Sequence, residues 1–282
     1  MEWVDILTAP LGFPFMQRGL IAAIATGAVC AILSCFLVLK GWSLMGDAIS
    51  HAVLPGVILA YIAGLPIIIG AFGSGIFCAL ATGYIKDRCR VKEDTVMGIV
   101  FSGMFALGLV LFSRIDTDQH LSHILFGNML GITPAELWQV LAIAGAVSLI
   151  VLVKRRDLML YCFDPAQARV LGLSVNLLHY GLLSLLALAI VAALQAVGVI
   201  LVIAMLIAPG ITAAQLCRRF DAMLLAAVLV SVSSCITGTL IGFYIDGATG
   251  PCIVIVQACL FVMAQIYRLA AHAARQRAVS LP

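Results

Sequence analysis

Residues 19–39 read GLIAAIATGAVCAILSCFLVL, with no charged side chain between Arg18 and Lys40. A bilayer core about 30 Å thick is crossed by about 20 consecutive apolar residues in a helix, and this stretch is long enough. The rest of the chain has the same character, since 63% of its 282 residues are hydrophobic and 10% are charged. A globular protein carries roughly 25% charged residues. The sequence therefore predicts an integral membrane protein in a lipid bilayer and indicates no nucleic-acid partner.

Clusters of charged and turn-forming residues divide the chain into apolar segments that are each suited to crossing a membrane as a helix. These segments run over 16–39, 44–64, 66–85, 94–113, 135–153, 174–194, 196–216, 222–245 and 251–270. The sequence thus predicts an all-α fold, a polytopic transmembrane helical bundle of about nine crossings. Eight or ten crossings fit the same pattern. Residues 1–282 form one transmembrane domain, because no soluble domain or low-complexity linker interrupts it.

The basic residues predict the orientation of the bundle, because Lys and Arg near helix ends are retained on the cytoplasmic side. With nine crossings, all of the 16 Lys and Arg residues except Arg18 and Arg114 fall on one face. This arrangement places the N-terminus outside and the C-terminus inside. It also makes the segment 157–174 cytoplasmic and the segment 114–133 external.

Two further features bear on the compartment of the chain. The nine cysteines include no CxxC pair and lie in or beside apolar runs, which is typical of small buried hydrophobic residues. The first 18 residues contain two acidic residues and two prolines, whereas a cleavable signal needs a basic start and an unbroken apolar stretch. We therefore expect no signal peptide.

The second apolar segment contains the motif LMGDAISHAVLPG, residues 44–56, in which Asp47 and His51 are four residues apart. On a helix they share one face. An Asp in the hydrocarbon region costs roughly 2.5–3.5 kcal/mol, so such residues usually face a bundle interior and serve a pathway or a partner. Carboxylate oxygen with imidazole nitrogen suits Mn, Fe(II) or Zn, and a twofold dimer would present two of each ligand. Alternatively, the two side chains simply bond to one another and cap the start of a helix.

Pro55 and Gly56 follow His51 by one turn. A proline inside a helix frees a backbone carbonyl and loosens the helix, so these two residues are candidates for a gating position. They could equally be ordinary packing residues.

The internal segment contains FDPAQARVLG, residues 163–172, which has the end signals of a short helix. Asp164 is expected to cap it, Pro165 to occupy its first position and Gly172 to end it. Because the chain contains no GxxxxGK[ST] phosphate-binding motif, any ATP is bound elsewhere. A short amphipathic cytoplasmic helix could then receive force from a partner. The alternative is a surface loop between two crossings.

The external segment contains a group of polar residues that superficially resembles a metal-binding cluster, namely Asp116, Asp118, His120 and His123. These residues are candidates for the place where a metal enters, although a solvated loop commonly carries such side chains. His179 lies near the internal end of a segment and is expected to be an interfacial or surface residue. Asp246 is expected in an external turn.

Three motifs together resemble the ABC-3 family, the permeases of zinc, manganese and iron ABC importers. They are residues 44–56, residues 163–172, and GVILVIAMLIAP over 198–209 with Thr212 following, and the resemblance covers essentially the full chain. It implies that Asp47 and His51 line the translocation path and contact the metal, and it adds Pro209 to the gating candidates. It also implies that the second motif docks on an ATPase through Phe163, Asp164, Pro165, Gln167, Ala168, Arg169, Leu171 and Gly172.

The finer resemblance is to manganese/iron chelate-type bacterial permeases, through residues 39–47 and 92–103, although zinc permeases share the Asp–His pair. It implies a multi-pass permease in the bacterial cytoplasmic (inner) membrane, with transported Mn²⁺, Fe²⁺ or Zn²⁺ and no permanent cofactor. The implied partners are a cytoplasmic ATPase dimer that hydrolyses ATP, an external metal-binding protein and a second permease subunit, most simply an identical copy. The alternatives from other classes are a gradient-driven secondary metal transporter and an intramembrane protease, and the HExxH motif of a metalloprotease is not present.

Overall fold

A computed structural model describes residues 10–42, 44–91, 93–114 and 129–279. All regular structure in these ranges is helical. Two short 3-10 helices, Pro10–Gly12 and Met129–Gly131, precede longer elements. The α-helices are α2 (Pro14–Lys40), α3 (Met45–Ile62), α4 (Ile67–Arg88), α5 (Glu93–Phe112), α7 (Pro134–Val153), α8 (Arg155–Phe163), α9 (Pro165–Val170), α10 (Val175–Val197), α11 (Val199–Leu216), α12 (Phe220–Ile245) and α13 (Thr249–Val279).

Each of the nine apolar segments corresponds to one of the long helices, which confirms the prediction of an all-α membrane bundle. Eight of them are long and apolar enough to cross a membrane, and α11 contributes a shorter apolar stretch over Leu201–Leu216. The largest boundary difference is in α13, which continues to Val279 where the apolar segment ends near 270. The reason is that a helix propagates through residues with high helix propensity after the apolar stretch ends, and the sequence there is rich in Ala and Arg.

Local signals in the sequence explain where individual helices begin and end. At the start of α7, Thr133 and Glu136 form a capping box, in which the Thr133 N–H donates to Glu136 Oε2 at 2.8 Å. At the end of α2, Gly41 takes a φ of +76°, which only glycine adopts without strain. Asp246 ends α12 in the left-handed region, so the expected turn is present there.

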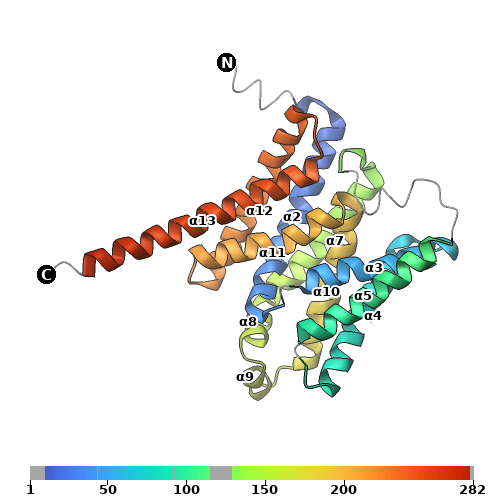
Figure 1. Cartoon of the computed structure of the whole chain (residues 1–282), viewed down its shortest axis with the longest axis horizontal. Helices are drawn as coiled ribbons and strands as arrows, with labels where there is room; N and C mark the ends of the chain where they lie inside the picture. Colours follow the sequence, from blue (N-terminus) through green and yellow to red (C-terminus); the bar gives the residue numbers. More distant parts are fainter. Residues whose placement is uncertain (1–9, 43, 92, 115–128, 280–282) are drawn as a thin grey trace.

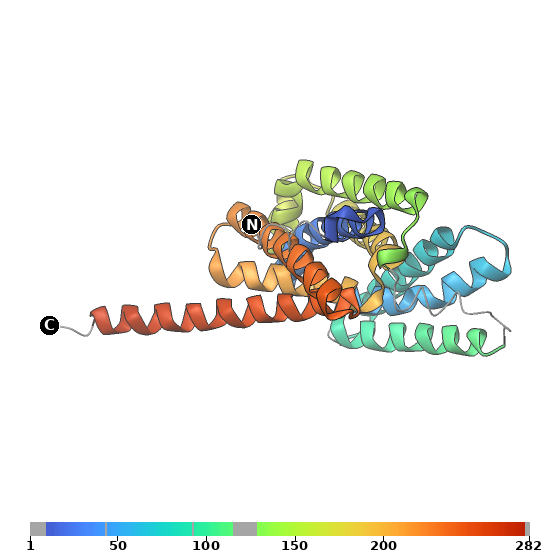
Figure 2. The same ribbon diagram turned by 90° about the horizontal axis from the view of Figure 1, so that it is seen from above.

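The helices differ greatly in how much of their surface the chain itself covers. In the apolar spans of α2 and α3, 72% of the residues are buried, whereas in those of α5 and α13 the share is 17%. Figures 1 and 2 show α2 within the bundle and α13 extending away from it toward the C-terminus. α3 therefore lies inside the protein, and α5 covers it on one side.

The contact between α3 and α4 is made backbone to backbone. A Cβ atom on Gly56 would collide with the Gly70 carbonyl oxygen, and a Cβ on Gly70 would collide with that of Gly56. The Ser74 hydroxyl donates across the same contact to the Ala52 carbonyl at 2.5 Å. Small residues permit this close approach in membranes, so Gly56 has a packing role whether or not it also serves gating.

Candidate functional site

Asp47 and His51 lie on the first two turns of α3 and contact one another. Asp47 Oδ1 is 3.3 Å from His51 Nε2, and the two side chains are 30% and 32% exposed. At the start of α3 the cap residue is Leu44, which makes no side-chain capping hydrogen bond, and Asp47 lies in the first turn. The mutual contact of the two side chains is therefore present, and the N-cap position itself is not held by either of them.

Two aromatic rings of α5 form a wall around the imidazole of His51. The Phe101 ring stacks on it with centroids 6.1 Å apart, and the Phe105 ring meets it edge-on at 5.1 Å. α5 can approach this closely because Gly108 fits against Leu54 and the backbone nitrogen of Pro55. The His51 ring thus packs against α5 on one side and meets Asp47 through its Nε2 atom.

The chemistry of this pair suits a transition metal ion, because carboxylate oxygen with imidazole nitrogen is a donor pair for Mn, Fe(II) or Zn. Asp47 Oδ1 and His51 Nε2 contact one another at 3.3 Å. Within the described ranges, no group of three or more His, Cys, Asp or Glu side chains could hold a metal. About one-third of each side chain is exposed, so other groups can approach the pair from that side.

The gating candidates occupy closely packed positions. Pro55 lies inside α3 and Pro209 inside α11. Beside Pro209, the Ser34 hydroxyl of α2 donates to the Ile207 carbonyl at 3.3 Å and accepts from the Gly210 N–H at 3.0 Å. These bonds connect α2 to the part of α11 where the proline interrupts the helical hydrogen-bond pattern.

The short helix expected in the internal segment is present as α9. The Asp164 Oδ1 atom accepts from the Ala166 and Gln167 N–H groups at 2.9 and 3.0 Å, and Pro165 occupies the first turn. At the other end, Gly172 has a φ of +79° and the Leu173 N–H donates to the Ala168 carbonyl at 3.0 Å, which is a Schellman motif. The sequence analysis did not anticipate α8, a separate helix directly before α9.

The helices α8 and α9 lie at one end of the bundle, at the lower edge of Figure 1, and they expose large apolar side chains. Phe163 is 82% exposed and Leu171 65% exposed, and Gln167 and Arg169 are also exposed, whereas Ala168 is buried. Val170, at 85%, extends this apolar surface and was missed by the sequence analysis. We call Phe163, Val170 and Leu171 the docking surface.

A cluster of aromatic and basic residues that the sequence analysis missed lies between α8 and the start of α3. The Tyr161 hydroxyl is hydrogen-bonded to His179 Nδ1 at 2.7 Å, and Trp42 packs edge-on against the His179 ring at 5.3 Å. Lys40 Nζ lies 4.2 Å from the centroid of the Tyr161 ring. Trp42 and Tyr161 are both buried. His179 is therefore a partly buried, hydrogen-bonded residue. This could not be predicted from its neighbours in the sequence, because Tyr161 and Trp42 lie in other segments of the chain.

The four polar residues of the external segment, Asp116, Asp118, His120 and His123, lie outside the described residues. Their role where a metal enters stays a prediction.

Comparison with known proteins shows to which family the chain belongs. The model of the ABC 3 transport family matches residues 12–268. The chain belongs to the ABC-3 family. It is 73% identical over 263 residues to the chelated iron transport system membrane protein YfeD of Yersinia pestis, covering 93% of this chain and 89% of that one. It is 52% identical over 261 residues to the manganese transport system membrane protein MntB of a Synechocystis strain, covering 92% and 85%.

A solved structure agrees with the fold of this ABC-3 protein. A chain in PsaBC from Streptococcus pneumoniae in complex with Fab matches it with a TM-score of 0.84 and 37% identity, over 93% of this chain and 94% of that one. The predicted family is confirmed, and the chain is a multi-pass membrane permease of that family. The predicted likeness to manganese and iron permeases is confirmed as well.

Proposed function

We propose that this ABC-3 permease carries a divalent transition metal, manganese or iron in preference to zinc, into the cell as part of an ATP-driven, binding-protein-dependent importer. The observation that carries the proposal is the Asp47–His51 pair, which has the ligand chemistry for such an ion, is about one-third exposed and lies on a largely buried apolar helix. The names of its relatives, which refer to chelated iron and manganese transport, support the choice of metal. The permease itself performs no covalent chemistry.

A second copy of the chain would complete the site. Two permeases related by a twofold axis through the exposed side of the pair would supply two carboxylates and two imidazoles to one passage. Four protein ligands leave part of a six-coordinate shell to water, so the ion is bound loosely and released readily. The external metal-binding protein then supplies the affinity for capture, and the cytoplasmic ATPase dimer supplies the free energy.

The route from the ATPase to the metal passes through contacts within the chain. The docking surface lies on α8 and α9, and Tyr161 on α8 is bonded to His179, which packs against Trp42 just ahead of α3. α3 carries Asp47 and His51. A displacement of α8 would therefore be passed to α3 through the packed rings of Tyr161, His179 and Trp42.

Uptake of labelled ions tests this function directly. Cells that express the transport system should accumulate ⁵⁴Mn or ⁵⁵Fe faster than cells without this gene, and ⁶⁵Zn should compete weakly. Uptake that prefers zinc would favour a zinc importer of the same family. Uptake that continues without the ATPase and collapses with the proton gradient would favour a secondary transporter and contradict the proposal.

Tyr161→Phe tests the coupling route, because it removes the hydroxyl that bonds to His179 and keeps the ring. The bond contributes about 1 kcal/mol to holding α8 against α10, so its loss should lower the number of ions transported per ATP hydrolysed. The matched control is Tyr180→Phe, since the Tyr180 ring is partly exposed and also touches His179. If both variants transport the same number of ions per ATP hydrolysed, the Tyr161–His179 bond does not take part in coupling.

The proposed orientation places Cys89, an exposed residue after α4, in the cytoplasm. A membrane-impermeant maleimide should therefore label it in inverted vesicles but not in intact cells. Burial raises the pKa of the Cys162 thiol to about 12, so this second cytoplasmic thiol stays protonated and unreactive. Because Cys217 and Cys252 are also partly exposed, the labelling is made in a Cys217→Ser/Cys252→Ser/Cys259→Ser background. There Cys89→Ser should remove the signal, and labelling of Cys89 in intact cells would reverse the orientation.

A further inference from the structure

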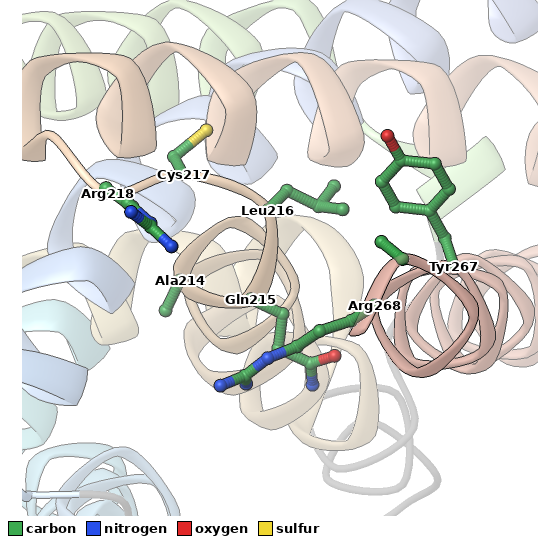
Figure 3. A pocket seen from close by; sticks show the side chains of 8 residues that line it. Ala214, Gln215, Leu216, Cys217, Arg218, Tyr267 and Arg268 are labelled. Carbon is green, nitrogen blue, oxygen red and sulfur yellow. The ribbon is translucent and has the colours of Figure 1, made fainter. Parts of the chain in front are cut away.

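A pocket of about 360 Å³ lies between the end of α11 and the last part of the α13 apolar span. Figure 3 shows Arg268 extending from α13 toward Gln215 at the end of α11, with Arg218 directed into the same region. Both arginines are exposed. Among the described residues, no carboxylate forms an ion pair with either of them. Two cationic side chains therefore converge on one pocket without an internal counter-charge.

The pocket also contains an acceptor without a donor. Gln215 Oε1 is buried and accepts no hydrogen bond within the described part of the chain. A buried polar atom normally has a partner, so a ligand here should offer a hydroxyl or N–H donor as well as negative charge. A bare anion satisfies the arginines but leaves Gln215 Oε1 unpaired.

The position of the pocket along α13 indicates a ligand with an apolar part. Arg268 lies near the end of the apolar span Thr249–Ala271, and Tyr267 beside it is 68% exposed, as is typical of an aromatic residue at the membrane–water boundary. In the turns before Tyr267, α13 exposes the apolar side chains of Val262, Met263 and Ile266. The charged pocket thus adjoins a surface suited to acyl chains.

We propose that this pocket binds the headgroup of an anionic phospholipid that carries headgroup hydroxyls, such as phosphatidylglycerol. The phosphate accepts hydrogen bonds from Arg218 and Arg268, whose guanidinium groups match phosphate oxygens in geometry. A headgroup hydroxyl donates to Gln215 Oε1, and the acyl chains lie along Val262, Met263 and Ile266. The lipid fills the space between α11 and α13 and connects the two helices at the membrane surface.

The test is a lipid titration of the purified full-length protein, followed by native mass spectrometry. Wild-type protein should retain phosphatidylglycerol at concentrations where phosphatidylcholine, which lacks net charge and headgroup hydroxyls, is lost. The double variant Arg218→Gln/Arg268→Gln should bind phosphatidylglycerol about 30-fold more weakly, because each arginine at the membrane surface supplies a roughly fivefold attraction. The charge-preserving variant Arg218→Lys/Arg268→Lys should stay within about fivefold of wild type, which separates loss of charge from loss of folding.

The control variant Arg88→Gln/Arg90→Gln removes two exposed arginines at the end of α4 and should retain the lipid as wild type does. Equal losses in the control and the test variant would show unspecific attraction and overturn the proposal. Displacement of the lipid by millimolar inorganic phosphate would also overturn it and assign the pocket to a free anion. Unchanged lipid binding by Arg218→Gln/Arg268→Gln, with loss of a protein partner, would assign the pocket to a protein contact instead.

Discussion

Replacement of either Asp47 or His51 by alanine is expected to abolish metal uptake while the protein still inserts into the membrane. In the proposed site each chain supplies two ligands, so either change would halve its contribution. Residues that only support metal ligands cost about 10–100-fold in affinity or activity when mutated, and loss of a ligand itself should exceed that range. Folding should be preserved, because both side chains are about one-third exposed and their removal leaves no closed cavity.

The measurement is initial-rate uptake of ⁵⁴Mn or ⁵⁵Fe, normalised to the amount of permease in the membrane fraction. Asp246→Asn is the matched control, since it removes a carboxylate far from the pair in sequence at a position where asparagine tolerates the left-handed backbone. This control should transport normally. Full uptake by Asp47→Ala or His51→Ala would refute a pathway role for the pair.

Phe163→Ala is expected to detach the permease from its ATPase. Phe163 is 82% exposed in the isolated chain, so its truncation should leave the permease folded. An aromatic side chain at the centre of an interface commonly contributes about 2 kcal/mol or more, which corresponds to roughly 30-fold weaker association. We therefore expect loss of co-purification and of transport-stimulated ATP hydrolysis together.

Ile245→Ala provides the comparison, because Ile245 is 70% exposed at the end of α12 and lies outside the docking surface. It should retain the ATPase. If Phe163→Ala co-purified with the ATPase as wild type does, and stimulated hydrolysis equally, then α8 and α9 would not form the docking element.

The features that the sequence could predict are those encoded within a few neighbouring residues. Apolar length fixed the nine helical segments, and the Asp164 and Gly172 end signals fixed α9, because capping depends on side chains two to five positions apart. The adjacency of Asp47 and His51 followed from one helical turn.

The features that could not be predicted depend on contacts between distant segments. The Tyr161–His179 bond joins α8 to α10, and the Phe101 and Phe105 wall around His51 comes from α5. Nothing local to His179 distinguishes a bonded imidazole from a surface one. The length of α13 was underestimated because the prediction used the apolar stretch, which ends near residue 270. The helix continues to Val279 because the residues that follow have high helix propensity.

The fit of Gly56 against Gly70 has a mechanical consequence. The backbones of α3 and α4 are in close contact at Gly56 and Gly70, so we expect these two helices to move together as one hairpin. In the proposed transport cycle this hairpin would swing as a unit about the Gly41 turn before α3. The metal pair would be carried along with the hairpin instead of being reshaped by bending at Pro55.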